Sequence, residues 1–280
     1  MTEAPDDNAV DIDALLEQCR TGDTRAQITA MHVLEKLDAP HAVPVILPLL
    51  ASTDEFVRKV AAGALGWLGE EHLDQIGPSL ETLLDDPANM VRDVAAEALG
   101  LLRYAPARVA LERVLLGDKD WIVRASAAEA LGEIGDADAL PALGAALDDE
   151  MYPVRSYTAD AIGQLGDEAQ LPVIQRRLET ETHPGPRACL LVVALRFGDE
   201  AAFDDLLAVM QTVDEELADT VLRSIDDLLI MPVPASITAR AAELDRGLAE
   251  LAPRSGINAP YAEKLRERLA ELVKAGGASE

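Results

Sequence analysis

The sequence has 280 residues and is strongly acidic, with 51 Asp and Glu against 24 Lys and Arg, which gives a formal net charge of −27. Hydrophobic residues make up 49% of the chain, which supplies a large core and excludes a wholly disordered protein. Binding to a nucleic-acid backbone or to an anionic membrane surface needs clustered cations. We therefore expect no nucleic-acid partner and no membrane insertion.

The first residues are acidic and lack the basic and apolar regions of a signal peptide, so no signal peptide is predicted. Residues 1–10 are predicted to form a disordered acidic tail. The two cysteines, Cys19 and Cys189, lie far apart in the chain and are predicted to be free thiols, which favours a reducing cytoplasm. Only five of the 24 basic residues are Lys. An excess of carboxylates with few lysines predicts a halophilic, archaeal source, because salt screens the repulsion. The alternative is an acidic binding protein from a high-GC bacterium.

A thirteen-residue run recurs along the chain, first as Val57-Arg-Lys-Val-Ala-Ala-Gly-Ala-Leu-Gly-Trp-Leu-Gly69 and next as Val91-Arg-Asp-Val-Ala-Ala-Glu-Ala-Leu-Gly-Leu-Leu-Arg103. Its arginine recurs at intervals of 34, 32, 31 and 32 residues, at Arg58, Arg92, Arg124, Arg155 and Arg187. Self-similarity at this period indicates a solenoid of stacked supersecondary units.

Each copy is predicted to form the second helix of a two-helix hairpin. In the first copy the apolar residues Val57, Ala61, Leu65 and Leu68 fall on one stripe of a helix. Another apolar helix precedes each copy, and an acid-rich turn, such as residues 85–86, joins the two helices. Carboxylates in these turns suit the start of the second helix.

The Val-Arg-x-x-Ala-Ala-x-Ala-Leu-Gly run resembles HEAT repeats of the phycobilisome-lyase type. The resemblance covers roughly residues 11–230 and is specific to the repeat rather than to one activity. It implies an all-α fold, a right-handed α-solenoid of about six to seven HEAT-like helical hairpins, with the second helices along a concave surface. Residues 231–274 are predicted to form a C-terminal helical cap, and residues 275–280 a disordered tail.

The five repeated arginines lie near predicted helix N-termini, where a cation opposes the helix dipole. They therefore need carboxylate or carbonyl partners, which the acidic turns supply. We predict a structural Arg–carboxylate ladder rather than a ladder that binds a ligand.

Positions one, five and nine residues after each arginine lie away from the apolar stripe and are predicted to line the concave surface. Most of these side chains near the middle of the chain are acidic, with apolar residues such as Val192 toward the ends. The predicted partner-binding face comprises Trp67, Asp93, Glu97, Glu129, Glu133, Asp160 and Arg196. An apolar anchor beside a charged groove suits a protein partner with a basic or mixed basic and apolar surface. The alternative is that these acids are only solvated side chains of an acid-rich protein.

A second candidate surface is an exposed aromatic ridge formed by Trp121 and Tyr152, each three residues before a repeated arginine. Burial of these rings in the core is the alternative.

No catalytic motif accompanies the repeat. Deoxyhypusine hydroxylase is a HEAT-repeat enzyme of similar fold, but its His-Glu metal motifs are missing here. The histidines are scattered without the spacing of zinc ligands, and no nucleophile motif occurs: His32, His41, His72 and His183. We expect no catalytic residue, no metal and no cofactor.

The sequence therefore predicts a noncatalytic, cytoplasmic protein–protein interaction scaffold or adaptor that uses the acidic concave face. Similar archaeal proteins include adaptors between taxis signalling and the motility apparatus, so a signalling, taxis or motility assembly is the expected setting. The alternative is a bilin lyase or isomerase-like subunit acting on phycobiliproteins, as the family name implies. The salt-adapted charge pattern counts against this alternative.

Overall fold

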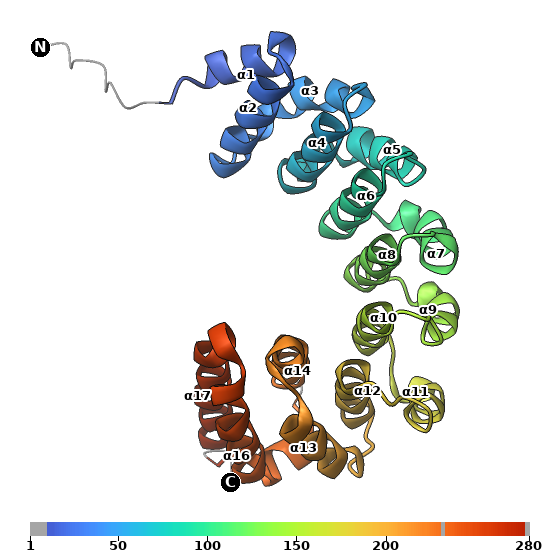
Figure 1. The fold of residues 1–280 in the computed structure, drawn as a ribbon, viewed down its shortest axis with the longest axis vertical. Coiled ribbons are helices and arrows are strands. Elements are labelled where there is room, and N and C mark those ends of the chain that lie inside the picture. The colour runs from blue at the N-terminus through green and yellow to red at the C-terminus, as the bar shows by residue number, and fades with distance from the viewer. Residues whose placement is uncertain (1–9, 231–232, 278–280) are drawn as a thin grey trace, which may run out of the picture. The chain divides into compact units, whose positions relative to one another are not determined.

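A computed structural model describes residues 10–230 and 233–277, and every regular element within these ranges is an α-helix or a 3-10 helix. The all-α prediction is therefore confirmed for the described residues. The described part of the chain contains seventeen α-helices, which follow one another along the ribbon (Figure 1). They divide into two compact units, residues 1–136 and 137–280. Most of the predicted tail over residues 1–10 lies outside the described residues, and the first α-helix begins at Ile12.

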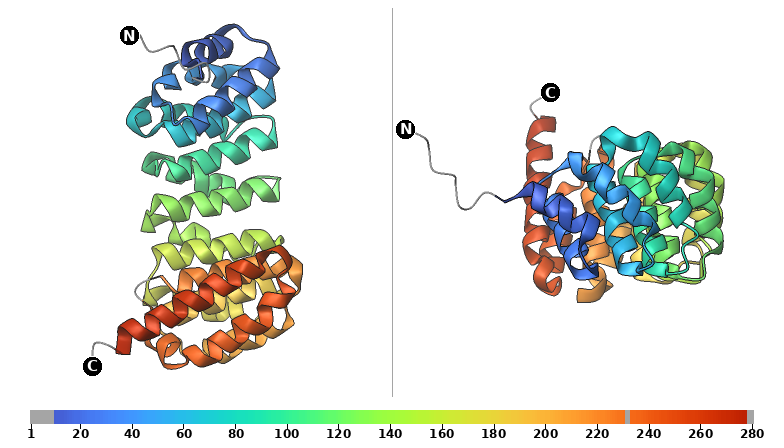
Figure 2. Two further views of the ribbon diagram at one scale, coloured as in Figure 1. Left: turned by 90° about the vertical axis from the view of Figure 1, so that its left-hand side faces the viewer. Right: turned by 90° about the horizontal axis from the view of Figure 1, so that it is seen from above.

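Unit 1 contains an inner row of helices that pack side by side in chain order. The inner row consists of α2 (Thr24–Lys36), α4 (Glu55–Leu68), α6 (Asn89–Leu101) and α8 (Trp121–Ile134). The outer row consists of α3 (Val43–Ile46), α5 (Leu73–Leu83) and α7 (Arg108–Gly117), while α1 (Ile12–Thr21) packs on α2. The helices of unit 1, coloured blue to green, lie in successive layers on the left of Figure 2.

The inner helices form because their sequences combine an N-cap with an apolar stripe. Asp54 caps α4, since its carboxylate accepts hydrogen bonds from the backbone N–H groups of Phe56 and Val57. The predicted stripe of α4 is confirmed, because its four apolar residues are all buried. Small residues let neighbouring helices approach closely. A Cβ atom added at Gly66 would lie 2.9 Å from the Cβ atom of Ala98 on α6.

Unit 2 repeats this arrangement. Its inner helices are α10 (Tyr152–Leu165), α12 (Pro184–Arg196) and α14 (Glu215–Leu228), and its outer helices are α9 (Leu140–Ala146), α11 (Leu171–Leu178) and α13 (Ala202–Thr212). Helix α12 contacts four other helices, α10, α11, α13 and α14. Val192 on α12 is therefore only 2% exposed. The expectation that Val192 supplies an exposed apolar anchor is wrong, because the helices packed on α12 cover this side chain.

Three more helices end unit 2: α15 (Ala235–Ala239), α16 (Ala241–Leu251) and α17 (Ala259–Gly277). Helix α16 packs on α13, and α17 packs on both α14 and α16. The division into a solenoid over residues 11–230 and a cap over residues 231–274 stays a prediction. Residues 275–277 were expected to be disordered but are helical, while residues 278–280 lie outside the described ranges.

None of the described helices is both long enough and apolar enough to cross a membrane. The two cysteines are free thiols, as the sequence predicts, and both are fully buried.

Candidate partner-binding face

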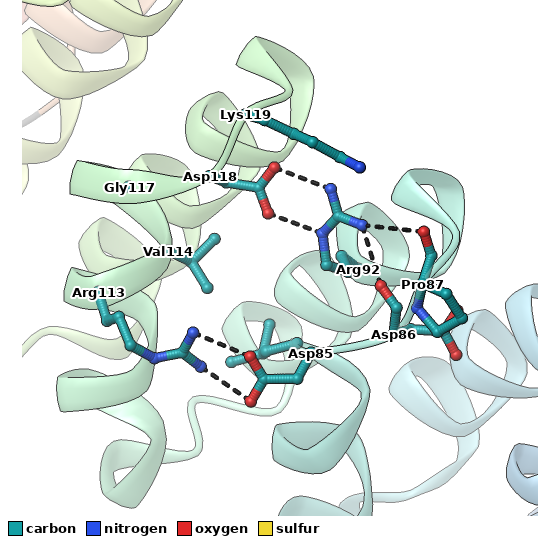
Figure 3. A pocket seen from close by; sticks show the side chains of 10 residues that line it. Asp85, Asp86, Pro87, Arg92, Arg113, Val114, Gly117, Asp118 and Lys119 are labelled. Carbon is teal, nitrogen blue, oxygen red and sulfur yellow. Dashed lines mark hydrogen bonds and ion pairs between the residues drawn. The ribbon is translucent and has the colours of Figure 1, made fainter.

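A repeated arginine network links successive hairpins within each unit. The Nε and Nη2 groups of Arg92 donate to the two carboxylate oxygens of Asp118, at 2.7 and 2.8 Å. Its Nη1 group donates to the backbone carbonyl oxygen of Asp86 at 2.9 Å (Figure 3). All three nitrogens of this buried guanidinium are thereby used in holding the turns together.

The same geometry recurs at other repeated arginines. Arg58 donates two hydrogen bonds to the carboxylate of Asp86, at 2.7 and 2.8 Å. Arg155 does the same to Glu181, at 2.7 and 3.0 Å. In both cases Nη1 donates to the carbonyl oxygen six residues earlier.

The other two members of the predicted ladder, Arg124 and Arg187, keep the hydrogen bond from Nη1 to the carbonyl oxygen six residues earlier. Arg187 reaches Asp205 with a single hydrogen bond of 2.8 Å, and that carboxylate is 58% exposed. Arg124 is buried, and its Nη1 group donates to the carbonyl oxygen of Asp118 at 2.8 Å.

The turn carboxylates remain ionised although they are buried. Burial alone would raise the pKa of Asp86 and of Asp118. Hydrogen bonds from Arg58 and Arg92, and from a backbone N–H group in each turn, more than offset this effect and lower both pKa values below the ordinary range. The carboxylate of Glu181 has a lowered pKa for the same reasons. These arginines and carboxylates neutralise one another and are therefore structural.

A cleft of about 420 Å³ opens between two of these turns (Figure 3). Its walls carry the Arg92–Asp118 pair and a second ion pair in which Arg113 binds Asp85 at 2.9 and 3.1 Å. The arginines and their carboxylate partners already satisfy each other, so the cleft is explained by the stacking of repeats.

Five of the seven residues predicted to bind a partner come from the inner row of unit 1. They are Trp67 on α4, Asp93 and Glu97 on α6, and Glu129 and Glu133 on α8. We call these five residues, with Leu101 on α6, the acidic face. Neighbouring inner helices pack against each other, so the repeat places these side chains on adjacent helices at matching positions.

One end of the acidic face is apolar. Trp67 is 64% exposed and Leu101 is 43% exposed. A Cβ atom added at Gly66, the residue before Trp67, would lie 3.7 Å from Cδ1 of Leu101. The side chain of Leu101 therefore extends from α6 toward α4, beside the residue that precedes Trp67.

The rest of the acidic face carries carboxylates, two of which have raised pKa values. The pKa of Glu97 is raised first by burial and then by repulsion from Asp93 and Glu129. The pKa of Glu133 is raised by burial and by Glu129. Asp93 accepts a hydrogen bond of 2.6 Å from the Ser126 hydroxyl. The cluster repels itself, and a cation placed against it would relieve that repulsion.

The remaining two predicted residues, Asp160 and Arg196, are half-buried members of unit 2. The pKa of the nearby Asp227 is raised by burial, which Arg196 partly opposes. Not every position predicted for the surface is accessible, since Ala125 and Ala188, each one residue after an arginine, are buried.

Trp121 and Tyr152 also belong to different units. Trp121 is 37% exposed. The half-buried ring of Tyr152 stacks on His183, with the ring centroids 3.9 Å apart. The sequence analysis did not identify two further exposed apolar residues, Phe56 and Ile122. In the repeat they stand one position after that of Trp121. Their shared position, two residues before a repeated arginine, was the signal that could have identified them.

Within the described residues there is no group of three or more His, Cys, Asp or Glu side chains arranged to hold a metal ion. The buried thiol of Cys189 has a pKa raised mainly by burial, next by Asp160, and lies 3.2 Å from the Ser224 hydroxyl. A thiol that stays protonated is a poor nucleophile.

A sequence model described as HEAT repeats matches residues 12–100, 76–156 and 109–192. No curated protein matches the sequence.

One solved structure with a similar fold is the complex of CpcE and CpcF of phycocyanin lyase from Nostoc sp. PCC7120, with a TM-score of 0.56. The sequence identity is 22%, and the match covers 88% of this chain and 98% of that chain. YibA of Escherichia coli has 19% identity over 85% of this chain and 93% of that chain, with a TM-score of 0.57. A structure of Kap95p with RanGDP has 15% identity over 92% of this chain and 41% of that chain, with a TM-score of 0.54. At these identities the likeness shows the fold alone, which is an α-solenoid.

Proposed function

The chain belongs to the HEAT-repeat family, and from this premise we propose that it is a noncatalytic scaffold or adaptor that binds another protein through its acidic face. The partner has a basic or mixed basic and apolar surface. Its apolar side chains contact Trp67 and Leu101, and its cations approach the carboxylates of α6 and α8.

The observation that carries this proposal is the juxtaposition of an exposed tryptophan with carboxylates that repel one another. Trp67 is 64% exposed, although a large aromatic ring contributes to stability mainly when it is buried. Glu97 and Glu133 have raised pKa values, so ionisation costs these carboxylates more free energy than it costs a fully solvated glutamate. Binding a basic and apolar segment would relieve both penalties, and such aromatic anchors supply much of the energy of protein interfaces.

A noncatalytic role agrees with the rest of the molecule. The repeated arginines bind carboxylates and backbone carbonyls, and the thiol of Cys189 is buried with a raised pKa. These groups stabilise the fold rather than present reactive atoms.

We further propose that the protein works in a salt-rich, reducing cytoplasm, within a signalling, taxis or motility assembly. The net charge of −27 and the scarcity of Lys support the salt-rich setting. At high ionic strength long-range attraction is screened, so direct contact at the acidic face has to supply the affinity.

The test of the scaffold proposal is charge reversal on the acidic face. We expect Glu97→Lys with Glu129→Lys to reduce capture of the host's partner proteins at least about tenfold, because like charges placed opposite a basic partner cost several kcal/mol. Capture is measured by quantitative mass spectrometry at the salt concentration of the host. The matched control is Glu71→Lys with Glu168→Lys, which changes the charge equally at two exposed residues of short 3-10 helices.

Circular dichroism should show the same helicity for both variants and for the unchanged protein. Equal capture by the acidic-face variant and the control would contradict the proposal.

A bilin lyase or isomerase-like subunit is the second candidate, suggested by the fold likeness to the CpcE–CpcF complex over 98% of that chain. Incubation of the purified protein with bilin and an apo-phycobiliprotein tests it. A coloured adduct that survives denaturing electrophoresis would favour this function. Its absence, with partner capture intact, would leave the scaffold function.

A further inference from the structure

Unit 1 carries a second exposed apolar surface at the N-terminal ends of its inner helices. Trp67 and Leu101 of the acidic face lie at the C-terminal ends of α4 and α6. Phe56, Met90 and Ile122 are the second residues of α4, α6 and α8, and Trp121 begins α8. Phe56 is 52% exposed, Ile122 is 43% exposed, and Met90 is half-buried. We call these four residues the N-terminal ridge.

The ridge follows the order of the helices. Helix α4 packs on α6, and α6 packs on α8, so equivalent residues lie on adjacent helices (Figure 1). Packed helices are about 8–10 Å apart. The ridge therefore presents apolar side chains at that interval across three helices.

The repeat itself does not require apolar residues at this position. The second residues of α10 and α12 in unit 2 are Pro153 and Gly185, although both helices belong to the same repeat series. The hydrophobic contact that stabilises a helix start joins the residue before the N-cap to the fourth helical residue, and does not involve the second. The large side chains of the ridge thus lack a role in starting their helices.

Hydrogen bonds at the base of the ridge already hold the helix starts in place. Asp54 accepts hydrogen bonds from the N–H of Phe56 at 2.9 Å and from the Thr24 hydroxyl at 3.1 Å. Asp120 accepts one from the N–H of Ile122 at 3.0 Å, and another from the Asn89 amide.

The charges beside the ridge are mostly negative. Asp54, Glu55 and Asp120 flank it, and Lys119 is the basic residue that adjoins Asp120. A complementary partner therefore combines an apolar stripe with Lys or Arg on its flanks.

We propose that the N-terminal ridge docks an amphipathic α-helix of a partner protein, whose apolar residues recur every seven positions and whose flanks are basic. Seven residues of an α-helix span about 10.5 Å, close to the interval between the packed helices. An extended strand covers about 10 Å in three residues, which places successive contacts on opposite faces of the strand. The spacing therefore selects a helix.

This site is separate from the acidic face. Phe56 and Trp67 are eleven residues apart on α4, or about 16 Å along its axis. One solenoid unit could then bind two segments at once, through two edges of the same helices.

The test uses a designed peptide of 21 residues with Leu at heptad a and d positions and Lys elsewhere, and a second peptide of the same composition with the leucines redistributed to break the helical stripe. The protein carries Trp67→Phe, so that Trp121 is its single tryptophan. We expect the heptad peptide to shift the Trp121 emission to shorter wavelength and to gain helicity. The redistributed peptide should bind at least tenfold more weakly.

Two further variants locate the binding. Phe56→Gln with Ile122→Gln should weaken the binding of the heptad peptide at least tenfold. The matched control, Val109→Gln with Leu116→Gln, removes two exposed apolar side chains of α7 and should leave binding unchanged. The acidic face is itself proposed to bind a basic and apolar segment, so binding at the ridge is followed by the Trp121 emission alone. Glu97→Lys with Glu129→Lys should leave the shift of this emission unchanged, which separates this site from the proposed function. Equal binding of both peptides, no binding of either, or equal loss in the ridge variant and its control would overturn the proposal.

Discussion

The turns and the acidic face of unit 1 both contain partly buried carboxylates, but their pKa values move in opposite directions. In the turns, Asp86 and Asp118 have lowered pKa values. On the acidic face, Glu97 and Glu133 have raised pKa values. Burial is the largest cause in both regions. The difference arises because each turn carboxylate receives a guanidinium and a backbone N–H group, whereas each acidic-face carboxylate has another carboxylate beside it.

This contrast separates structural charges from available ones. A buried carboxylate that is fully paired contributes to folding and has little left to offer a partner. A carboxylate held near other carboxylates destabilises the free protein through like-charge repulsion, and a bound cation would reduce that repulsion. Such a stability cost is common at functional surfaces.

The largest predicted effect is the loss of a turn arginine. Arg92→Met should lower the free energy of unfolding by about 3–5 kcal/mol, because it leaves the carboxylate of Asp118 buried without its partner. The side chains of Arg92 and Asp118 are 7% and 9% exposed. Urea denaturation monitored by circular dichroism measures the change.

Arg113→Met is the matched control, since it breaks an ion pair with Asp85 in which both side chains are more than half exposed. It should cost only about 0–1 kcal/mol. Similar losses for the two variants would show that the buried pairing is not what stabilises the turns.

A smaller effect is expected where α6 and α8 approach each other. A Cβ atom added at Gly100 would overlap the carboxylate of Glu133 and lie 2.8 Å from Cα of Ala130. Gly100→Ala should therefore cost about 1–3 kcal/mol in calorimetric or denaturant unfolding, despite the better helix propensity of Ala. Gly117→Ala meets no atom within 4 Å and should be neutral or stabilising by about 0.4–1 kcal/mol. A stabilised Gly100→Ala protein would mean that the helices separate easily.

The smallest effect concerns the acidic face itself. Glu97→Gln with Glu133→Gln should raise the free energy of unfolding at pH 7 by a few tenths to about 1 kcal/mol, because it removes two charges that burial and like-charge repulsion both disfavour. Both pKa values are higher in the folded protein than in the unfolded chain, so the ionised forms reduce stability above those values. The gain should therefore disappear as the pH falls through them, and should shrink in high salt.

The turn carboxylates should show the opposite pH dependence. Their folded pKa values are lowered, so their stabilisation is present above the unfolded value of about 3.9 and is lost as the pH falls toward the folded value. Denaturation of Asp118→Asn and of the unchanged protein between pH 7 and pH 3 measures this. A difference that stays constant over this range would contradict the assignment.

Much of the fold could be predicted because equivalent residues recur at a regular spacing along the sequence. The period identifies the hairpins, and the stripe of Val57, Ala61 and Leu65 identifies the buried side of each inner helix. The sequence also pointed to the acidic turns as partners for the arginines, and Asp86 and Asp118 in those turns bind Arg58 and Arg92. These features depend on residues within one or two repeats of each other.

The environment of each surface position could not be predicted in the same way. Glu97 and Val192 occupy the same register position, yet Glu97 is exposed and Val192 is buried. The difference comes from α13 and α14, which pack against α12 and whose positions depend on contacts across the unit. The periodicity gives the direction of a side chain from its helix axis, but not what lies in that direction.

The turn aspartates also couple neighbouring hairpins in series. The carboxylate of Asp86 binds the arginine of the hairpin before it, and its carbonyl oxygen binds Arg92 of its own hairpin. Asp118 does the same between Arg92 and Arg124. Opening one hairpin therefore breaks bonds to both neighbours, which raises the nearest-neighbour interaction energy of this one-dimensional array. Amide protons across the three hairpins should then exchange in a single cooperative event rather than fray one hairpin at a time.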